Sequence, residues 1–231
     1  MITKANIICI PLTDDEIKTV MEKARKQLYI SKLDNLRTRH ANIQYDCILR
    51  GYIGEYAITK WLAQHDIAFD ETNYMNEDEN IDIDFLYKGK NIELKTSLIP
   101  DVDVVLEKSI ACRDIKLIKR ENDIIHLRGD IHLQIFFDQK RKAKDEWLTS
   151  RIINLEQIEI DELFDKILAK CYRNTTYFVG WIDKPTFVTK INSLPEADRT
   201  WTFKNAHKLF WNCKIIDCKK PADLPADLKN I

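Results

Sequence analysis

The sequence predicts a fold of helices and one mixed sheet, of the α/β or α+β class, in a single domain. Two helical patterns come first in the chain, at residues 13–36 and 42–64. Strand patterns follow, at residues 81–87, 91–97, 124–127, 131–137 and 176–182. No internal repeat or linker divides the 231 residues, and a hydrophobic share of 45% is enough for one good-sized core.

The first helix is predicted from a capping box at its start. Thr13 offers a hydroxyl at the N-cap position, and Glu16 offers a carboxylate three residues later. We expect the helix that begins there to run to about Leu36.

The second helix carries a carboxylate within its apolar stripe. Apolar residues recur at helical spacing, at Ile48, Tyr52, Ile58 and Leu62. Glu55 falls inside this stripe, where a carboxylate needs a partner. One explanation is a metal or catalytic site, and the simpler structural one is an ion pair with Arg50. Gly51 and Gly54 leave this part of the helix free to pack closely against a sheet.

The remaining elements are a helix over 161–171, β-like sequence over 201–217 and a loosely held tail punctuated by Pro221 and Pro225. No apolar run approaches the roughly 20 residues that cross a bilayer. The chain has six cysteines without a C-x-x-C pair, at Cys9, Cys47, Cys112, Cys171, Cys213 and Cys218. We therefore expect reduced thiols and a cytoplasmic protein without a membrane segment.

Charge is distributed unevenly although the net charge is only −1. Between Trp61 and Tyr87 there are eight acidic residues and no Lys or Arg. Basic clusters lie elsewhere, at Arg37/Arg39/His40, Lys116/Lys119/Arg120, 140–144 and 204–220. An acidic pocket with basic flanks suits a metal site that handles a polyanion, whereas each cluster taken singly is typical of a solvated surface.

Two strands, over 81–87 and 91–97, flank a predicted turn at Lys88-Gly89. If these two residues form a two-residue hairpin loop, with glycine supplying a positive φ, the register of the strands is fixed. Asp84 then faces Glu93.

This register brings charged groups together on one face of the hairpin. Glu93 and Lys95 share that face, and Asp82 faces Lys95. Opposed carboxylates repel each other, and a divalent cation such as Mg²⁺ removes the conflict. The structural alternative is an exposed strand face that carries alternating Glu and Lys side chains.

The ordered set Gly54-Glu55, Asp84 and Glu93-Leu94-Lys95 resembles the PD-(D/E)xK nuclease superfamily, which includes type II restriction endonucleases and phage and defence nucleases. The resemblance covers about 36–97, and extends more weakly to 131–138. This chain has Ile83 before Asp84 where the name-giving pattern has proline.

The resemblance implies an α/β, restriction-endonuclease-like core with a central mixed sheet flanked by helices, within a single nuclease domain 1–231. The core would span about 40–140, with an N-terminal helix and a C-terminal β-rich extension. It implies Glu55, Asp84, Glu93 and Lys95 as catalytic residues. Of these, the three acids Asp84, Glu93 and Glu55 would bind Mg²⁺, with Mn²⁺ as a substitute.

The implied function is hydrolysis of double-stranded DNA by a Mg²⁺-dependent endonuclease, working as a homodimer in which each subunit cuts one strand. Arg37, Arg39, His40 and the region 201–220 are candidates for contacts to DNA. Three alternatives stay open: a Holliday-junction resolvase, a non-catalytic DNA-binding module with the same fold, and a subunit of a larger defence complex. Asp82 competes with Asp84 as the principal metal ligand, and Gln134 either lines the site or bonds to backbone.

Overall fold

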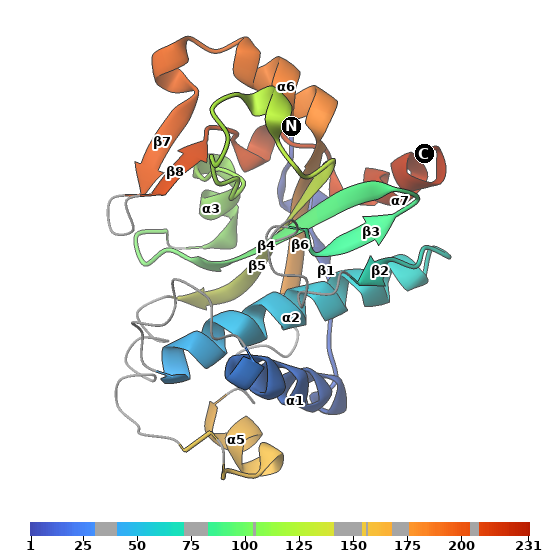
Figure 1. Cartoon of the computed structure of the whole chain (residues 1–231), viewed down its shortest axis with the longest axis vertical. Coiled ribbons are helices and arrows are strands. Elements are labelled where there is room, and N and C mark those ends of the chain that lie inside the picture. Colours follow the sequence, from blue (N-terminus) through green and yellow to red (C-terminus); the bar gives the residue numbers. More distant parts are fainter. Residues whose placement is uncertain are drawn as a thin grey trace.

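The protein is built around one mixed β-sheet (Figure 1). The computed structural model describes residues 1–30, 41–71, 83–103, 105–140, 154–155, 157–167, 176–203 and 208–231. Within them, the strands of this sheet are arranged in the order β1-β6-β5-β4-β3-β2. Their bounds are Ile8–Cys9 (β1), Asp70–Glu71 (β2), Phe85–Tyr87 (β3), Lys90–Ile99 (β4), Ile131–Lys140 (β5) and Thr176–Asp183 (β6). The β4–β5 pair is parallel and the other pairs are antiparallel.

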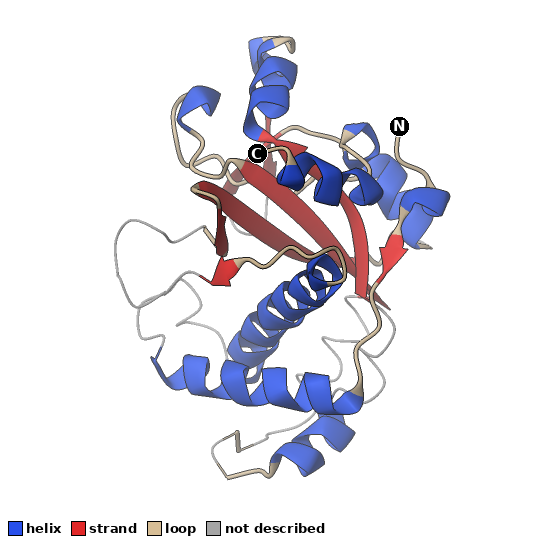
Figure 2. Ribbon diagram, turned by 90° about the vertical axis from the view of Figure 1, so that its right-hand side faces the viewer, coloured by secondary structure: helices blue, strands red, loops and turns tan. Residues whose placement is uncertain are grey.

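Helices cover both faces of the sheet, which confirms the mixed α/β class (Figure 2). On one face, α2 (Ala41–Ala63) packs against the sheet, α1 (Asp14–Ile30) packs against α2, and α5 (Ile160–Ile167) packs against α1 (Figure 1). Helix α7 (Leu224–Lys229) contributes to the same hydrophobic core. The other face packs against α3 (Leu106–Cys112), α6 (Lys184–Asn192) and the hairpin of β7 (Thr200–Phe203) and β8 (Lys208–Trp211). Each face therefore has its own hydrophobic core. No helix in the described ranges combines the length and the apolar character needed to cross a membrane.

The predicted start of the first helix is confirmed. The Thr13 hydroxyl accepts a hydrogen bond from the Glu16 backbone N–H at 3.3 Å, and the Glu16 carboxylate accepts one from the Thr13 N–H at 2.7 Å. This reciprocal pair is the capping box. The predicted extension of the helix to Leu36 lies outside the described residues. The second helix has bounds within one residue of those predicted.

The hairpin turn also forms as predicted. Tyr87 pairs with Lys90, and the two residues between them, Lys88 and Gly89, have φ values of 48° and 76°. Two successive positive φ angles match a type I′ turn, whose twist suits a tight hairpin. Counted from the turn, the last paired residues are Phe85 and Ile92. Asp84, the next residue toward the N-terminus, lies outside the paired strand.

Two predictions are wrong. Residues 124–127 do not form a strand, because the Asp123 carboxylate accepts a hydrogen bond from the Ile125 N–H and starts a short 3-10 helix, Ile124–His126. The tail is not loosely held: a 3-10 helix, Pro221–Asp223, leads into α7, which packs against the core. Leu224 and Leu228 of α7 are completely buried, because their spacing of four residues puts both on one helical face.

Helix α2 decides which face of β4 is available for a site. A Cβ atom on Gly54 would lie 2.5 Å from Thr96 Cγ2 and 3.4 Å from Leu94 Cδ2, so the helix passes very close to these strand residues. Side chains alternate along a strand. Glu93 and Lys95 therefore project from the face of the sheet that α2 does not cover.

Candidate active site

Glu93 is a buried carboxylate with two charged or polar partners from the same sheet. Its side chain is 7% exposed. Lys95 Nζ lies 2.7 Å from its Oε1 atom, and His132 Nδ1 lies 2.9 Å from its Oε2 atom. Burial alone would raise the pKa of Glu93. The ammonium of Lys95 and the hydrogen bond and charge of His132 outweigh burial and lower that pKa to about 2. Glu93 is thus held ionised.

Lys95 lies between this buried carboxylate and solvent. Its side chain is 24% exposed, whereas that of Glu93 is 7% exposed. The two residues are separated by one position on β4, so strand alternation puts them on the same face. The ammonium can therefore contact both Glu93 and a ligand that approaches from solvent.

Asp84 joins the cluster from the residue before β3. Its backbone N–H donates to the Ile92 carbonyl at 2.9 Å, and its Oδ2 atom accepts from the Leu94 N–H at 2.5 Å. The carboxylate therefore lies against the peptide that links Glu93 to Leu94. The predicted hairpin neighbourhood of Asp84 and Glu93 is present, although strand pairing ends at Phe85.

Glu55, the fourth predicted site residue, lies on the helix that covers the other face of the sheet. It lies on α2 next to Gly54, and α2 covers the face that carries Leu94 and Thr96. Glu55 thus approaches from the opposite face to Glu93. The competing acid Asp82 lies outside the described residues, as do Arg37, Arg39 and His40.

His132 is the site residue that the sequence did not single out. It is 1% exposed and pairs with Glu93 in the parallel β4–β5 ladder. A pattern was present, because His132 and Gln134 are the two polar residues, at alternate positions, of the otherwise apolar run 131–137. The position opposite Glu93, however, depends on a pairing between strands far apart in sequence.

Gln134 satisfies backbone groups, as its structural interpretation predicted. Its Oε1 atom accepts from the Lys116 N–H at 3.0 Å, and its Nε2 donates to the Lys95 carbonyl at 3.0 Å and to Ser97 Oγ at 3.1 Å. Gln134 therefore connects the Lys116 segment to strand β4, which carries Glu93 and Lys95, through hydrogen bonds.

The β7–β8 hairpin contributes aromatic residues beside the same segment. The rings of Trp201 and Phe210 stack with centroids 4.8 Å apart, and Lys116 Nζ lies 5.1 Å from the Trp201 ring. Phe210 and Trp211 are buried, whereas Trp201 and Phe203 are half-buried. Burial lowers the pKa of Lys116.

The acids of the cluster fit a cation that takes few protein ligands. In the part of the chain that the structure describes, no three His, Cys, Asp or Glu side chains are grouped so that they could hold a metal ion together. Mg²⁺ commonly takes one or two carboxylates from a protein and keeps several waters. Asp84 and Glu93, on adjacent strands, match that smaller set in number and in ligand chemistry.

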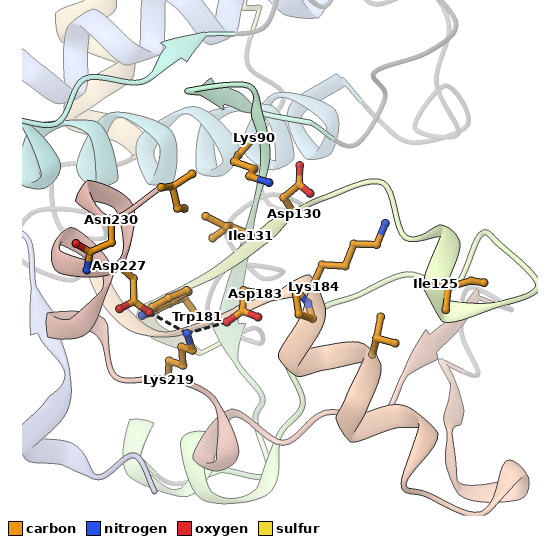
Figure 3. A pocket seen from close by; sticks show the side chains of 13 residues that line it. Lys90, Ile125, Asp130, Ile131, Trp181, Asp183, Lys184, Lys219, Asp227 and Asn230 are labelled. Carbon is orange, nitrogen blue, oxygen red and sulfur yellow. Dashed lines mark hydrogen bonds and ion pairs between the residues drawn. The ribbon is translucent and has the colours of Figure 1, made fainter.

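A separate cavity of about 730 Å³ lies where β5 and β6 meet α6 and the C-terminus (Figure 3). Lys219 bridges Asp183 and Asp227 there at 2.7 and 2.8 Å, with its ammonium 4.5 Å from the Trp181 ring centroid. The candidate site residues do not line this cavity. Two of its acids, Asp183 and Asp227, are thus paired with a lysine, and the third, Asp130, accepts a hydrogen bond from the Asn91 N–H.

Comparison with protein-family models, with curated proteins and with solved structures gives no match. The chemistry of the site is therefore the basis for assigning a function.

Proposed function

We propose that the chain is a Mg²⁺-dependent endodeoxyribonuclease with a restriction-endonuclease-like core that hydrolyses phosphodiester bonds in double-stranded DNA. The observation that carries the proposal is the ion pair of Lys95 and Glu93 on β4, with the Asp84 carboxylate on the adjoining peptide. An ionised acid buried beside a partly exposed lysine is unusual on a purely structural strand face. It suits metal-assisted phosphodiester hydrolysis, in which carboxylates hold the cation and a positive charge steadies the phosphate.

Asp84 and Glu93 are the residues that would hold the cation. Their oxygen atoms are the hard ligands that Mg²⁺ prefers, and the low pKa of Glu93 keeps its carboxylate charged at neutral pH. When bound, Mg²⁺ lowers the pKa of a water molecule and neutralises charge on the scissile phosphate.

Lys95 supplies a positive charge at the outer side of the same group. Its ammonium is fixed by the contact with Glu93 Oε1 and is partly exposed, so a phosphate oxygen can approach it. There it would orient the attacking water and stabilise the negative charge that develops on phosphorus.

Glu55 has an accessory role in this proposal. Because α2 packs on the other face of the sheet, Glu55 would act on the hairpin through packing or through solvent. Asp84, Glu93 and Lys95 form the minimal site.

Cleavage of supercoiled plasmid tests the proposal. The wild-type protein is incubated with plasmid in the presence of Mg²⁺ or of EDTA, beside Asp84→Asn and Lys95→Ala. We expect metal-dependent linear or fragmented DNA, and a loss of rate of at least about 100-fold in both variants. Lys90→Ala is the matched control, because Lys90 is an exposed lysine on the same strand and should cut at the parental rate.

The other outcomes identify other functions. Cutting confined to four-way junctions, run as a parallel substrate, would indicate a junction resolvase. DNA binding without cleavage under Mg²⁺ or Mn²⁺ would indicate a non-catalytic module. If Lys95→Ala cuts as fast as the parent, the proposed site is wrong.

A further inference from the structure

We propose that His132 is a positioning residue that fixes the Glu93 carboxylate so that its Oε1 atom is presented to the metal. The inference rests on the proposed function, and it assigns a role to a residue that lies behind the site. The basis is the set of contacts that the imidazole ring makes on three sides, with Glu93, Gly129 and Phe187.

The first side is the contact with Glu93. His132 is directly opposite Glu93 in the parallel ladder, and its Nδ1 atom lies 2.9 Å from Oε2. At 1% exposed, the ring is closed off from solvent, so water does not compete for this contact.

The second side is the backbone of the preceding turn. His132 Nε2 lies 3.1 Å from the Gly129 carbonyl oxygen. A carbonyl oxygen and an ionised carboxylate both only accept, so Nε2 donates to Gly129 and Nδ1 donates to Glu93. A Cβ atom at position 129 would lie 2.5 Å from His132 Cε1, so glycine is needed for the turn to approach the ring this closely.

The third side is packing against α6. The Phe187 ring lies with its centroid 6.3 Å from that of His132, and Phe187 is completely buried. With hydrogen-bond partners at both nitrogen atoms and an aromatic neighbour, the imidazole has one defined orientation.

The two oxygen atoms of Glu93 therefore have different partners. His132 occupies Oε2 on the inner side, and Lys95 contacts Oε1 on the side nearer solvent. Rotation of the carboxylate would break both contacts. A cation that enters from solvent therefore meets Oε1 in a fixed position. Residues that orient a metal ligand in this way typically change metal affinity by about 10- to 100-fold.

A pair of substitutions separates positioning from simple packing. In His132→Asn, the shorter amide can put a donor near the position of Nδ1 and keep the contact with Glu93. In His132→Gln, the longer amide reaches the position of Nε2 and keeps the contact with Gly129 instead. Both variants are polar and neutral, so loss of packing should affect them similarly.

The readout is binding of Mn²⁺ to the full-length protein, measured by electron paramagnetic resonance, together with plasmid cleavage and the thermal unfolding midpoint. We expect His132→Asn to bind Mn²⁺ within about threefold of the parent. We expect His132→Gln to bind about 10- to 100-fold more weakly at a similar unfolding midpoint.

The outcomes distinguish this inference from the proposed function. If both variants bind Mn²⁺ as tightly as a parent that cuts DNA, His132 is not a positioning residue, and the nuclease proposal stands. If the Asn and Gln variants differ as expected but no protein cuts DNA, the positioning role stands and the nuclease proposal fails. A parent that binds no Mn²⁺ overturns both.

Discussion

Glu93 is buried and ionised, so the free energy of unfolding depends on the pH through this carboxyl. The pKa of its carboxyl in the folded protein is about 2, below the ordinary value of 4.5. A carboxyl whose pKa is lowered by folding stabilises the folded state above its unfolded pKa. That contribution is lost as the pH falls from about 4.5 toward 2, because protons then bind the unfolded chain more strongly.

Glu93→Gln should remove this part of the pH dependence. Between about pH 6 and about pH 3, the parent should lose about 2 kcal/mol more of its free energy of unfolding than the variant does. Urea denaturation at the two pH values measures the difference. Asp103, whose pKa is also lowered to about 2 by the Arg113 and Ser109 hydrogen bonds, is common to both proteins and cancels. Equal losses would mean that Glu93 is not held ionised by its partners.

Two glycines of α2 offer a second comparison at the scale of single residues. A Cβ atom on Gly54 would lie 2.5 Å from Thr96 Cγ2, whereas the nearest atom to a Cβ on Gly51 is Glu55 Oε1 at 4.0 Å. Gly54→Ala should therefore destabilise the protein by about 1–3 kcal/mol through overpacking. Gly51→Ala should be neutral or stabilising by up to about 1 kcal/mol, because alanine favours a helix. Thermal or urea unfolding of both variants tests the close approach of α2 to β4, and a stable Gly54→Ala protein would contradict it.

Elements with strong local patterns could be predicted from the sequence. The capping box at Thr13 and the Lys88-Gly89 turn depend on residues no more than three positions apart, so neighbouring residues determine them. The predicted strand over 124–127 failed for the same reason: the Asp123 cap is also a local feature, and it outweighed the β-like composition.

The tail is an element in which tertiary packing outweighed the local pattern. Two prolines suggested a loosely held tail, yet Pro225 is in the first turn of α7, where proline is tolerated, and the helix is stabilised by burial. Its leucines could be assigned to a core only once the sheet was known.

Leu228→Ala tests this packing. Leu228 is completely buried, so truncation should lower the free energy of unfolding by about 2–5 kcal/mol. Lys229→Ala, at an exposed neighbouring position, should change it by less than about 0.5 kcal/mol. Similar effects of the two substitutions in urea denaturation would show that α7 is not part of the core.

At the scale of the whole molecule, the sheet brings together strands from both ends of the chain. Strand β6 lies beside β5 although 35 residues separate Lys140 from Thr176, and β1 from the N-terminus pairs with β6. The strands therefore extend beyond the predicted core of 40–140. The same long-range pairing sets His132 opposite Glu93, and helix packing sets Glu55 on the other face. Neither relation is encoded within a short window, so the sequence predicted the hairpin part of the site but not its complete composition.

If the chain cuts duplex DNA as proposed, cleavage of both strands should require two copies, because the described residues of one chain supply one minimal site and a duplex has two strands. We expect the parent protein to linearise a plasmid that carries a single target. Premixing with an excess of Lys95→Ala should turn the product into nicked circles, because most active subunits then share a dimer with an inactive one. Gel electrophoresis separates linear from nicked DNA, and the same excess of Lys90→Ala, which should be active, is expected to keep the product linear. If Lys95→Ala lowers the overall rate without accumulation of nicked circles, the subunits do not cut one strand each, and each monomer must cut both strands in succession.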